Sequence, residues 1–290
     1  MLGIFHMPLF FYVSGYLAYK TIPSWSETIT RLIKRVSNLI IPLLVVGSAY
    51  YFITQHRAMQ IISGHLGGYW FLYVLALLTV FFIIYDKIAS KCTKWYLYVT
   101  IWLIPYILIL LLKIKNIQIS TGDWFPVNHL VTYYRYYLVG WLCRKYIPFN
   151  KFLFENKLIF AIAFIAYLAQ WCFCGMHNIV LIYIGGMGAI IVLQSYLQSK
   201  DENSRFLKSL SYLGRNSLAI YVIHYFFIPN VSSVLHDFLD VGNPFIWQLT
   251  FAIFTTMPII AVSVFIGKLI EMNKYLNFIF FGKIFKVNEK

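Results

Sequence analysis

Long apolar runs recur along the whole chain and are separated by short polar segments. A helix that crosses a membrane needs about 20 mostly apolar residues. Nine runs approach this length, and they lie near residues 4–19, 37–54, 66–85, 95–112, 128–143, 158–175, 178–197, 212–228 and 247–267. No segment between them is long enough to form a separate domain. The pattern predicts an all-α, polytopic membrane helix bundle of about nine transmembrane helices, with residues 1–290 forming one membrane domain.

The composition supports a membrane protein and excludes several other classes. Of the 290 residues, 60% are hydrophobic and 12% are charged. Soluble domains carry about 25% charged residues, so too few charges remain to cover a soluble protein of this size. A soluble enzyme, a disordered chain and a disulfide scaffold are therefore excluded. The four cysteines show no spacing typical of zinc ligands, and we expect no metal site.

The net charge of +14 fits either a nucleic-acid partner or basic cytoplasmic loops. Twenty of the 24 lysines and arginines follow the first, third, fifth, seventh and ninth runs, and three lie in the intervening loops. Arg135, inside the fifth run, completes the set. Basic loops mark the cytoplasmic side of a membrane protein. The alternation therefore predicts nine spans with a cytoplasmic C-terminus and argues against nucleic-acid binding.

The predicted topology has a consequence for the N-terminus. Nine spans with the C-terminus inside place Met1 outside. The chain then begins almost directly in a membrane helix, and its N-terminal residues show no signal-peptide pattern. Two explanations remain open. A preceding span is absent from this chain, or a short N-terminal span inserts unaided with its N-terminus outside.

Four histidines are predicted at a similar depth near the outer surface: His6, His65, His129 and His224. Histidine transfers protons near neutral pH, so these residues are candidates for an outer-facing site of proton transfer. Interfacial histidine, tryptophan and tyrosine also form ordinary anchoring belts. For His65 and His129 we favour anchoring, whereas His6 and His224 lie deeper in apolar sequence and stay open between the two roles.

The basic residue Arg135 and a basic cluster near residue 31 each have both a functional and a structural interpretation. Arg135 lies within a predicted span, where an arginine needs a partner or a wet cavity. It is a candidate contact for an anion or a carbonyl, or else a snorkelling or ion-paired side chain. Arg31, Lys34 and Arg35 share one helical face, because they are three and four residues apart. That face could hold phosphates or anchor the chain beside anionic lipid.

Four stretches resemble motifs of acyltransferase family 3, whose members are integral-membrane acyltransferases that often O-acetylate cell-surface sugars. Residues 5–16, FHMPLFFYVSGY, closely resemble the second membrane helix of that family, and residues 213–224, LGRNSLAIYVIH, resemble a late helix. Weaker similarity is found in residues 31–42, a basic loop leading into an Ile-Pro span, and in residues 69–75, YWFLYVL. The four stretches occur in the same order as the motifs of the family, and the similarity covers essentially the whole chain.

The resemblance implies a ten-helix fold of which this chain would lack the first span, together with the arginine and histidine of that span. It implies acetyl-CoA, or another acyl-CoA, as donor and a lipid-linked or surface glycan as acceptor, in a bacterial inner membrane. Candidate catalytic residues are His6, His224 and Arg135. Candidate substrate-binding residues are Trp70, Asn216, Ser217 and Tyr221, with Trp70, Tyr221 or Arg135 as oxyanion donors. Arg31, Lys34 and Arg35 would bind the CoA phosphates.

The family's Arg-x-x-Arg pattern is altered in this chain. Aligned on Pro42, it becomes Arg35-Val-Ser-Asn38, for which Arg31 and Lys34 could compensate. Two alternatives to an active acyltransferase stay open. One is an inactive relative of the family, and the other is a transporter of a glycan or lipid carrier.

Overall fold

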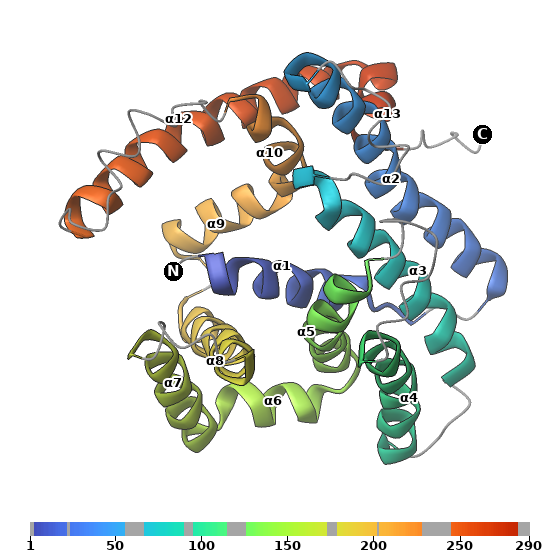
Figure 1. The fold of residues 1–290 in the computed structure, drawn as a ribbon, viewed down its shortest axis with the longest axis vertical. Coiled ribbons are helices and arrows are strands. Elements are labelled where there is room, and N and C mark those ends of the chain that lie inside the picture. The colour runs from blue at the N-terminus through green and yellow to red at the C-terminus, as the bar shows by residue number, and fades with distance from the viewer. Residues whose placement is uncertain are drawn as a thin grey trace. The chain divides into compact units, whose positions relative to one another are not determined.

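The computed structural model describes residues 3–21, 24–55, 67–89, 95–114, 126–172, 179–201, 203–227 and 245–283, and all their regular structure is helical (Figure 1). The elements in chain order are α1 (Gly3–Ala18), α2 (Trp25–Gln55), η2 (Gly67–Tyr69), α3 (Trp70–Ala89), α4 (Trp95–Ile114), α5 (Val127–Lys145), α6 (Ile147–Glu155), α7 (Lys157–Cys172), α8 (Ile179–Gln198), α9 (Arg205–Arg215), α10 (Ser217–Ile223), η4 (His224–Phe226), α12 (Phe245–Met272) and α13 (Lys274–Phe281).

Eight of the nine apolar runs coincide with one helix each, which confirms the all-helical prediction for the described residues. The eighth run, 212–228, differs, because α9 ends at Arg215 and α10 begins at Ser217. Two short helices, α6 and α13, were not predicted, since nine and eight residues are too few to register as a span.

Three of the described helical segments are long and apolar enough to cross a membrane: Trp25–Ile53, Trp70–Lys87 and Leu249–Met272. A fourth crossing is added if the bent pair Ile147–Glu155 and Lys157–Gln170, with an angle of 62° between its parts, counts as one span. Three further apolar segments within the described residues are shorter, namely Thr100–Leu111, Ile182–Gln198 and Ser217–Phe226. The total of nine spans and the cytoplasmic C-terminus therefore stay predictions.

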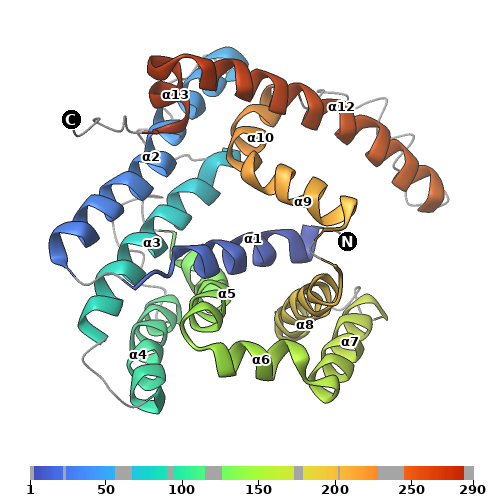
Figure 2. The same cartoon turned by 180° about the vertical axis from the view of Figure 1, so that it is seen from behind.

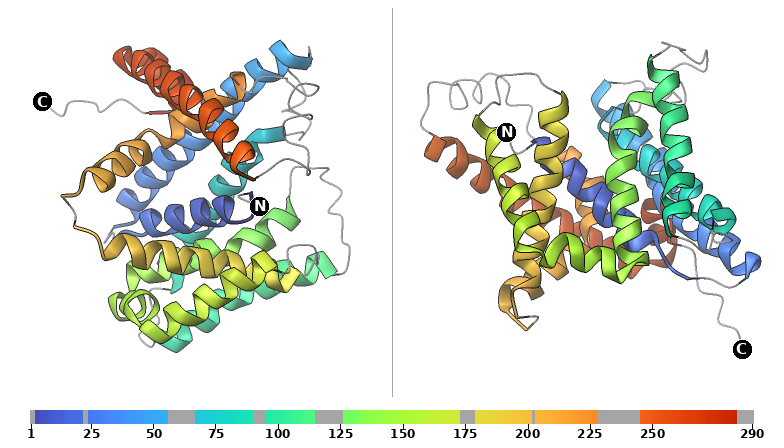
Figure 3. Two further views of the ribbon diagram at one scale, coloured as in Figure 1. Left: turned by 90° about the vertical axis from the view of Figure 1, so that its left-hand side faces the viewer. Right: turned by 90° about the horizontal axis from the view of Figure 1, so that it is seen from below.

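The chain divides into two compact units, the first made of residues 1–36 and 73–208. In this unit α1 packs closely against α5, and α7 lies beside α8 (Figure 3). Glycines make the first contact possible. A Cβ atom on Gly15 would overlap the carbonyl oxygen of Tyr137, and one on Gly140 would overlap that of Tyr12. The two backbones therefore touch directly, which fixes α1 on α5.

An aromatic core joins α3, α4 and α5 within the same unit. Phe82 stacks on Trp102 with ring centroids 4.3 Å apart, and the ring of Tyr137 lies 4.6 Å from Phe82. The Tyr134 hydroxyl donates to the Trp102 carbonyl at 2.8 Å. These buried rings contribute both apolar area and specific ring geometry, so they hold the three helices in register.

The second unit contains residues 37–72 and 209–290. Its core lies where α10, α12 and α13 meet, around Ala219, Ile223 and Phe281. The chain bends at Asn273, whose side chain caps α13 by accepting from two backbone N–H groups, and Figure 2 shows this bend from behind. Gly282 ends α13 with φ of 64°, a left-handed conformation that favours glycine.

Candidate functional site

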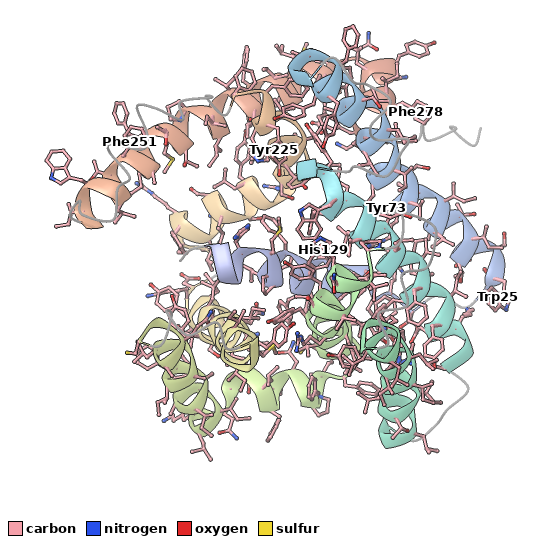
Figure 4. All side chains as sticks on the ribbon, viewed as in Figure 1. Trp25, Tyr73, His129, Tyr225, Phe251 and Phe278 are labelled. Carbon is pink, nitrogen blue, oxygen red and sulfur yellow. The ribbon has the colours of Figure 1, made fainter. Side chains whose placement is uncertain are left out.

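Tyrosine side chains from the second unit gather around the turn of η2. The Tyr221 hydroxyl donates to the Gly68 carbonyl at 2.6 Å, and the Tyr225 hydroxyl donates to the same oxygen at 3.0 Å. In return, the Tyr69 hydroxyl donates to the Val222 carbonyl at 3.2 Å. The side chain of Tyr225 is labelled in Figure 4. These reciprocal hydrogen bonds join η2 to α10.

Local sequence explains this arrangement. Tyr221 and Tyr225 are four residues apart, so they project from the same face of their helical segment. The Tyr225 ring lies directly over Gly68, where any side chain larger than hydrogen would collide with it. Tyr50, on α2, completes the cluster with its ring centroid 5.9 Å from those of Tyr69 and Tyr225.

His224 lies against this cluster, between Tyr221 and Tyr225. Its ring centroid is 4.1 Å from that of Tyr225 and 5.7 Å from that of Tyr221. The Nδ1 atom is 2.7 Å from the Tyr221 carbonyl oxygen and 3.1 Å from the Ile220 carbonyl oxygen. A carbonyl oxygen only accepts hydrogen bonds, so Nδ1 carries the proton of the neutral ring. The lone pair is then on Nε2, as a general base requires.

The other predicted substrate-binding residues lie at different places around this histidine. Trp70 contacts Phe71, and Phe71 packs on Tyr221 at 5.2 Å. Trp70 is thus linked to the cluster through one intervening ring. Asn216 and Ser217 are at the start of α10, eight and seven residues before His224, respectively. At about 1.5 Å per residue they are about 10–12 Å away along the helix.

Asn216 also has a structural role. Its side-chain amide donates to the Tyr212 carbonyl at 2.8 Å, which satisfies an oxygen at the end of α9. The hydroxyl of Tyr221 is likewise bonded to protein, so Tyr221 is better suited to position α10 than to donate to an oxyanion. The substrate contacts predicted for these residues stay predictions.

The basic residues at the start of α2 meet the end of α1 in the first unit. Arg31 donates through Nη2 to the Ala18 carbonyl at 2.5 Å and through Nη1 to the Lys20 carbonyl at 3.3 Å. Arg35 donates through Nη2 to the Leu17 carbonyl at 2.6 Å. The last carbonyls of a helix have no partner within it and carry a partial negative charge. The two guanidinium groups therefore cap α1.

A pocket of about 420 Å³ opens beside this cap. Three cations and three hydroxyls line it together with one carboxylate, and the lining residues are Lys20, Thr21, Ser26, Glu27, Thr30, Arg31 and Lys34. Net positive charge with hydroxyl donors suits phosphate groups. Arg31 and Lys34, two of the three predicted phosphate ligands, line the pocket, whereas Arg35 does not.

Arg135 lies between α5 and α8 in the first unit. Its guanidinium carbon is 3.2 Å from the centroid of the Tyr183 ring, and Nε donates to the Thr132 carbonyl at 3.2 Å. Nη2 is buried and makes no hydrogen bond among the described residues. Part of this charge is therefore stabilised by an aromatic face, and one buried donor is left for an anion or carbonyl.

The remaining candidates are more dispersed. His6 is exposed near the start of α1, and the ring of His129 stacks on Tyr133 with centroids 6.3 Å apart. His65 is outside the described residues. Over the part of the chain that is described, no cluster of three or more histidine, cysteine or acidic side chains could hold a metal.

Several residues in these places were not singled out from sequence. Gly68, Tyr69 and Tyr225 belong to the tyrosine cluster, and Lys20 lines the pocket. The glycine pair directly before the Tyr69-Trp70 motif and the four-residue spacing of Tyr221 and Tyr225 were available signals. Lys20 gave a weaker signal, since it looks like any other cytoplasmic lysine.

The family model of acyltransferase family 3, described as an acyltransferase domain, matches residues 1–265. No curated protein and no solved structure matches the chain. The match includes α1, η2, α10 and most of α12, and with them both candidate sites. A family model that covers more than nine-tenths of the chain establishes that this protein belongs to acyltransferase family 3.

Proposed function

We propose that this protein is a membrane-bound O-acyltransferase that moves an acetyl group from acetyl-CoA to a hydroxyl of a cell-surface or lipid-linked glycan. The acyltransferase domain over residues 1–265 supports acyl transfer in general, and the apolar helices support an integral membrane protein. The observation that carries the mechanism is the hydrogen bonding of His224, because it leaves the lone pair on Nε2.

The donor would bind at the pocket beside α1. CoA carries phosphates on its nucleotide end, and Lys20, Arg31 and Lys34 supply cations that would neutralise them. Hydroxyls of the same pocket would donate to phosphate oxygens. The pantetheine arm would then carry the thioester into the bundle. This assignment makes the pocket a donor-binding site and keeps Arg35 in its cap on α1.

The chemical step follows from acyl transfer between a thioester and an alcohol. Nε2 of His224 would accept the proton of the acceptor hydroxyl while the oxygen attacks the thioester carbonyl carbon. The tetrahedral intermediate then collapses, the carbon–sulfur bond breaks, and the ester forms. The leaving thiolate of CoA takes the proton from the imidazolium. Arg135, with its buried Nη2, is a candidate to stabilise negative charge on a bound anion or oxyanion.

The test measures acetyl transfer in two membrane preparations. One comes from cells that express the chain starting at Met1, and the other from cells that express the native gene with its upstream sequence intact. The membranes receive radiolabelled acetyl-CoA, and base-labile label is measured in the lipid-linked and surface glycan fractions. We expect label in glycan with the wild type and at least a hundredfold less with His224→Asn, since general base catalysis contributes about 10²–10⁴-fold. His129→Asn is the matched control and keeps activity.

Contrary results have separate meanings. Absence of label from both preparations, with the protein folded and abundant, contradicts the proposal and favours an inactive relative. Movement of glycan across the membrane without covalent label, and without a need for acetyl-CoA, favours a transporter. Equal activity of His224→Asn and wild type removes His224 from the mechanism and leaves acyl transfer itself standing.

A further inference from the structure

Helix α9 has two chemically different faces. Phe206, Leu210 and Leu213 follow one another at intervals of four and three residues, so they form an apolar stripe on one side. All three are exposed, with 58%, 42% and 37% of their surface accessible. No residue of α9 is buried. This stripe therefore has no protein core to cover it among the described residues.

The opposite face carries all the basic residues of α9. Arg205, Lys208 and Arg215 project from it, and α9 contains no acidic residue. Tyr212 lies on the same side, and the ammonium of Lys268 is 5.1 Å from its ring centroid. The cationic face is therefore extended by a lysine from α12. Such a helix, apolar on one side and with only cationic charges on the other, matches the interface of an anionic membrane.

The length and ends of α9 argue against a membrane crossing. Eleven residues span about 17 Å, and a bilayer core needs about 30 Å. A crossing would also bury charges at both ends and in the middle of the helix, which is costly. The chain breaks at Asn216, and Figure 1 shows α10 leaving in a different direction from α9.

We propose that α9 lies in the plane of the membrane surface, with its apolar stripe in the acyl boundary and its basic face on anionic phospholipid headgroups. The occupant of the exposed stripe is thus lipid, and the selecting chemistry is the phosphate of an anionic headgroup. Residues 212–215 of the eighth predicted span then lie at the membrane surface instead of crossing the bilayer. This inference does not depend on the acyltransferase reaction.

The test uses the full chain in vesicles of phosphatidylcholine and phosphatidylglycerol at about 7:3, with a photoreactive benzoylphenylalanine at one position of α9 at a time. Positions 206, 210 and 213 form the apolar set, and positions 211 and 212 form the matched set on the other side. Light-induced adducts are identified by mass spectrometry, so the native cysteines need no replacement. Only variants that elute as the folded protein are counted.

We expect lipid adducts at the apolar set and none at positions 211 and 212. The adducts at position 206 are enriched in phosphatidylglycerol relative to the bulk lipid. Lys208→Gln lowers that enrichment by about fivefold, the effect of one basic residue near an anionic surface. The control Lys151→Gln, on α6, leaves it unchanged.

Three outcomes overturn the proposal. Lipid adducts at all five positions mean that α9 is surrounded by lipid, as in a membrane crossing. Protein adducts, or no adducts, at the apolar set mean that something other than lipid covers the stripe. Adducts that follow the bulk lipid ratio, in wild type and Lys208→Gln alike, mean that the basic face selects no anionic headgroup.

Discussion

At the scale of single residues, His224 is the proposed base, and contacts within its own helical segment set its tautomer. Replacement by asparagine keeps an N–H donor near the position of Nδ1 and removes Nε2. Because the contact with the Tyr221 carbonyl can persist, we expect a folded protein with unchanged thermal midpoint. Acetyl transfer falls by about 10²–10⁴-fold, the usual contribution of a general base. Thermal unfolding and the transfer assay on the same preparation check this, and a lowered midpoint would point to a structural role instead.

The tyrosine hydroxyls beside His224 have a different expected effect. Tyr221→Phe removes the 2.6 Å hydrogen bond to Gly68, whereas Tyr225→Phe removes the longer bond to the same oxygen. We expect Tyr221→Phe to lower the free energy of unfolding by about 1 kcal/mol, as for one buried hydrogen bond. Tyr225→Phe has a smaller effect. Denaturant unfolding of both variants measures the difference, and equal losses would contradict the ranking.

Sequence alone reached part of this site. The spacing of the late helix and its resemblance to the family identified His224 and Tyr221 as candidates. Their surroundings were beyond its reach, because Gly68 is more than 150 residues away in sequence from the tyrosines that bond to it. The direction of the Tyr221 hydroxyl, toward a backbone carbonyl, depends on that long-range contact and has no local signal.

At the scale of helices, the contacts at the end of α1 distinguish a capping role from a phosphate-binding role, whereas the sequence had suggested one shared role for the basic residues of α2. Arg31, Lys34 and Arg35 share one helical face and were predicted to act together on phosphates. In the structure Lys34 lines the pocket, Arg35 caps α1, and Arg31 contributes to both. Spacing predicted the shared face correctly, but the end of α1, which decides the roles, is brought there by tertiary packing.

Arg35→Gln is therefore expected to change stability, and Lys34→Gln is expected to change the binding of acetyl-CoA. Loss of the Arg35 cap lowers the free energy of unfolding by about 1 kcal/mol, the scale of a charge at a helix C-terminus. It also speeds hydrogen exchange in the last turn of α1. Lys34→Gln raises the KM for acetyl-CoA by about threefold to tenfold, if a charged contact of about 1 kcal/mol is lost. Exchange data and steady-state kinetics on both variants distinguish the roles.

The contact between α1 and α5 allows a further prediction at this scale. Gly140→Ala would place a methyl group on the Tyr12 carbonyl, where both partners are backbone and neither can rotate away. We expect a loss of about 1–3 kcal/mol or more, or failure to accumulate, as for an overpacked core site. Gly214→Ala is the control, since nothing lies within 4 Å of its added Cβ. Thermal midpoints in detergent compare the two, and equal midpoints would contradict close packing of α1 on α5.

Helix positions were largely predictable, and one boundary was not. Apolar runs of about 20 residues coincide with α1 to α5, α7, α8 and α12 because burial in lipid demands such runs. The start of the eighth run was misplaced because residues 212 and 213 are apolar enough to extend it, although they belong to α9. A window that counts hydrophobicity does not register the break at Asn216, which depends on hydrogen bonds at the end of α9.

At the scale of the whole molecule, the distribution of charge makes the strongest prediction that the structure leaves open. Loops rich in lysine and arginine alternate with loops that have few of them, as expected for nine crossings. Only three or four of the described helical segments are long and apolar enough to cross a membrane, so they do not account for this alternation. If nine spans exist, Lys151 and Asn203 face the cytoplasm and Asn128 faces outward. These three positions are exposed, so each can carry a reporter without disturbing the core.

Single cysteines at these positions, in a chain without its four native cysteines, test the topology that the charge pattern predicts. A membrane-impermeant maleimide on intact cells should label Asn128→Cys and leave Lys151→Cys and Asn203→Cys unlabelled until the cells are opened. The reason is that positively charged loops are retained on the cytoplasmic side during insertion. Labelling of Asn203→Cys in intact cells would contradict the alternation and place α9 on the outer surface. Protection of all three positions would remove a crossing between residues 128 and 151, so it would also reduce the number of spans.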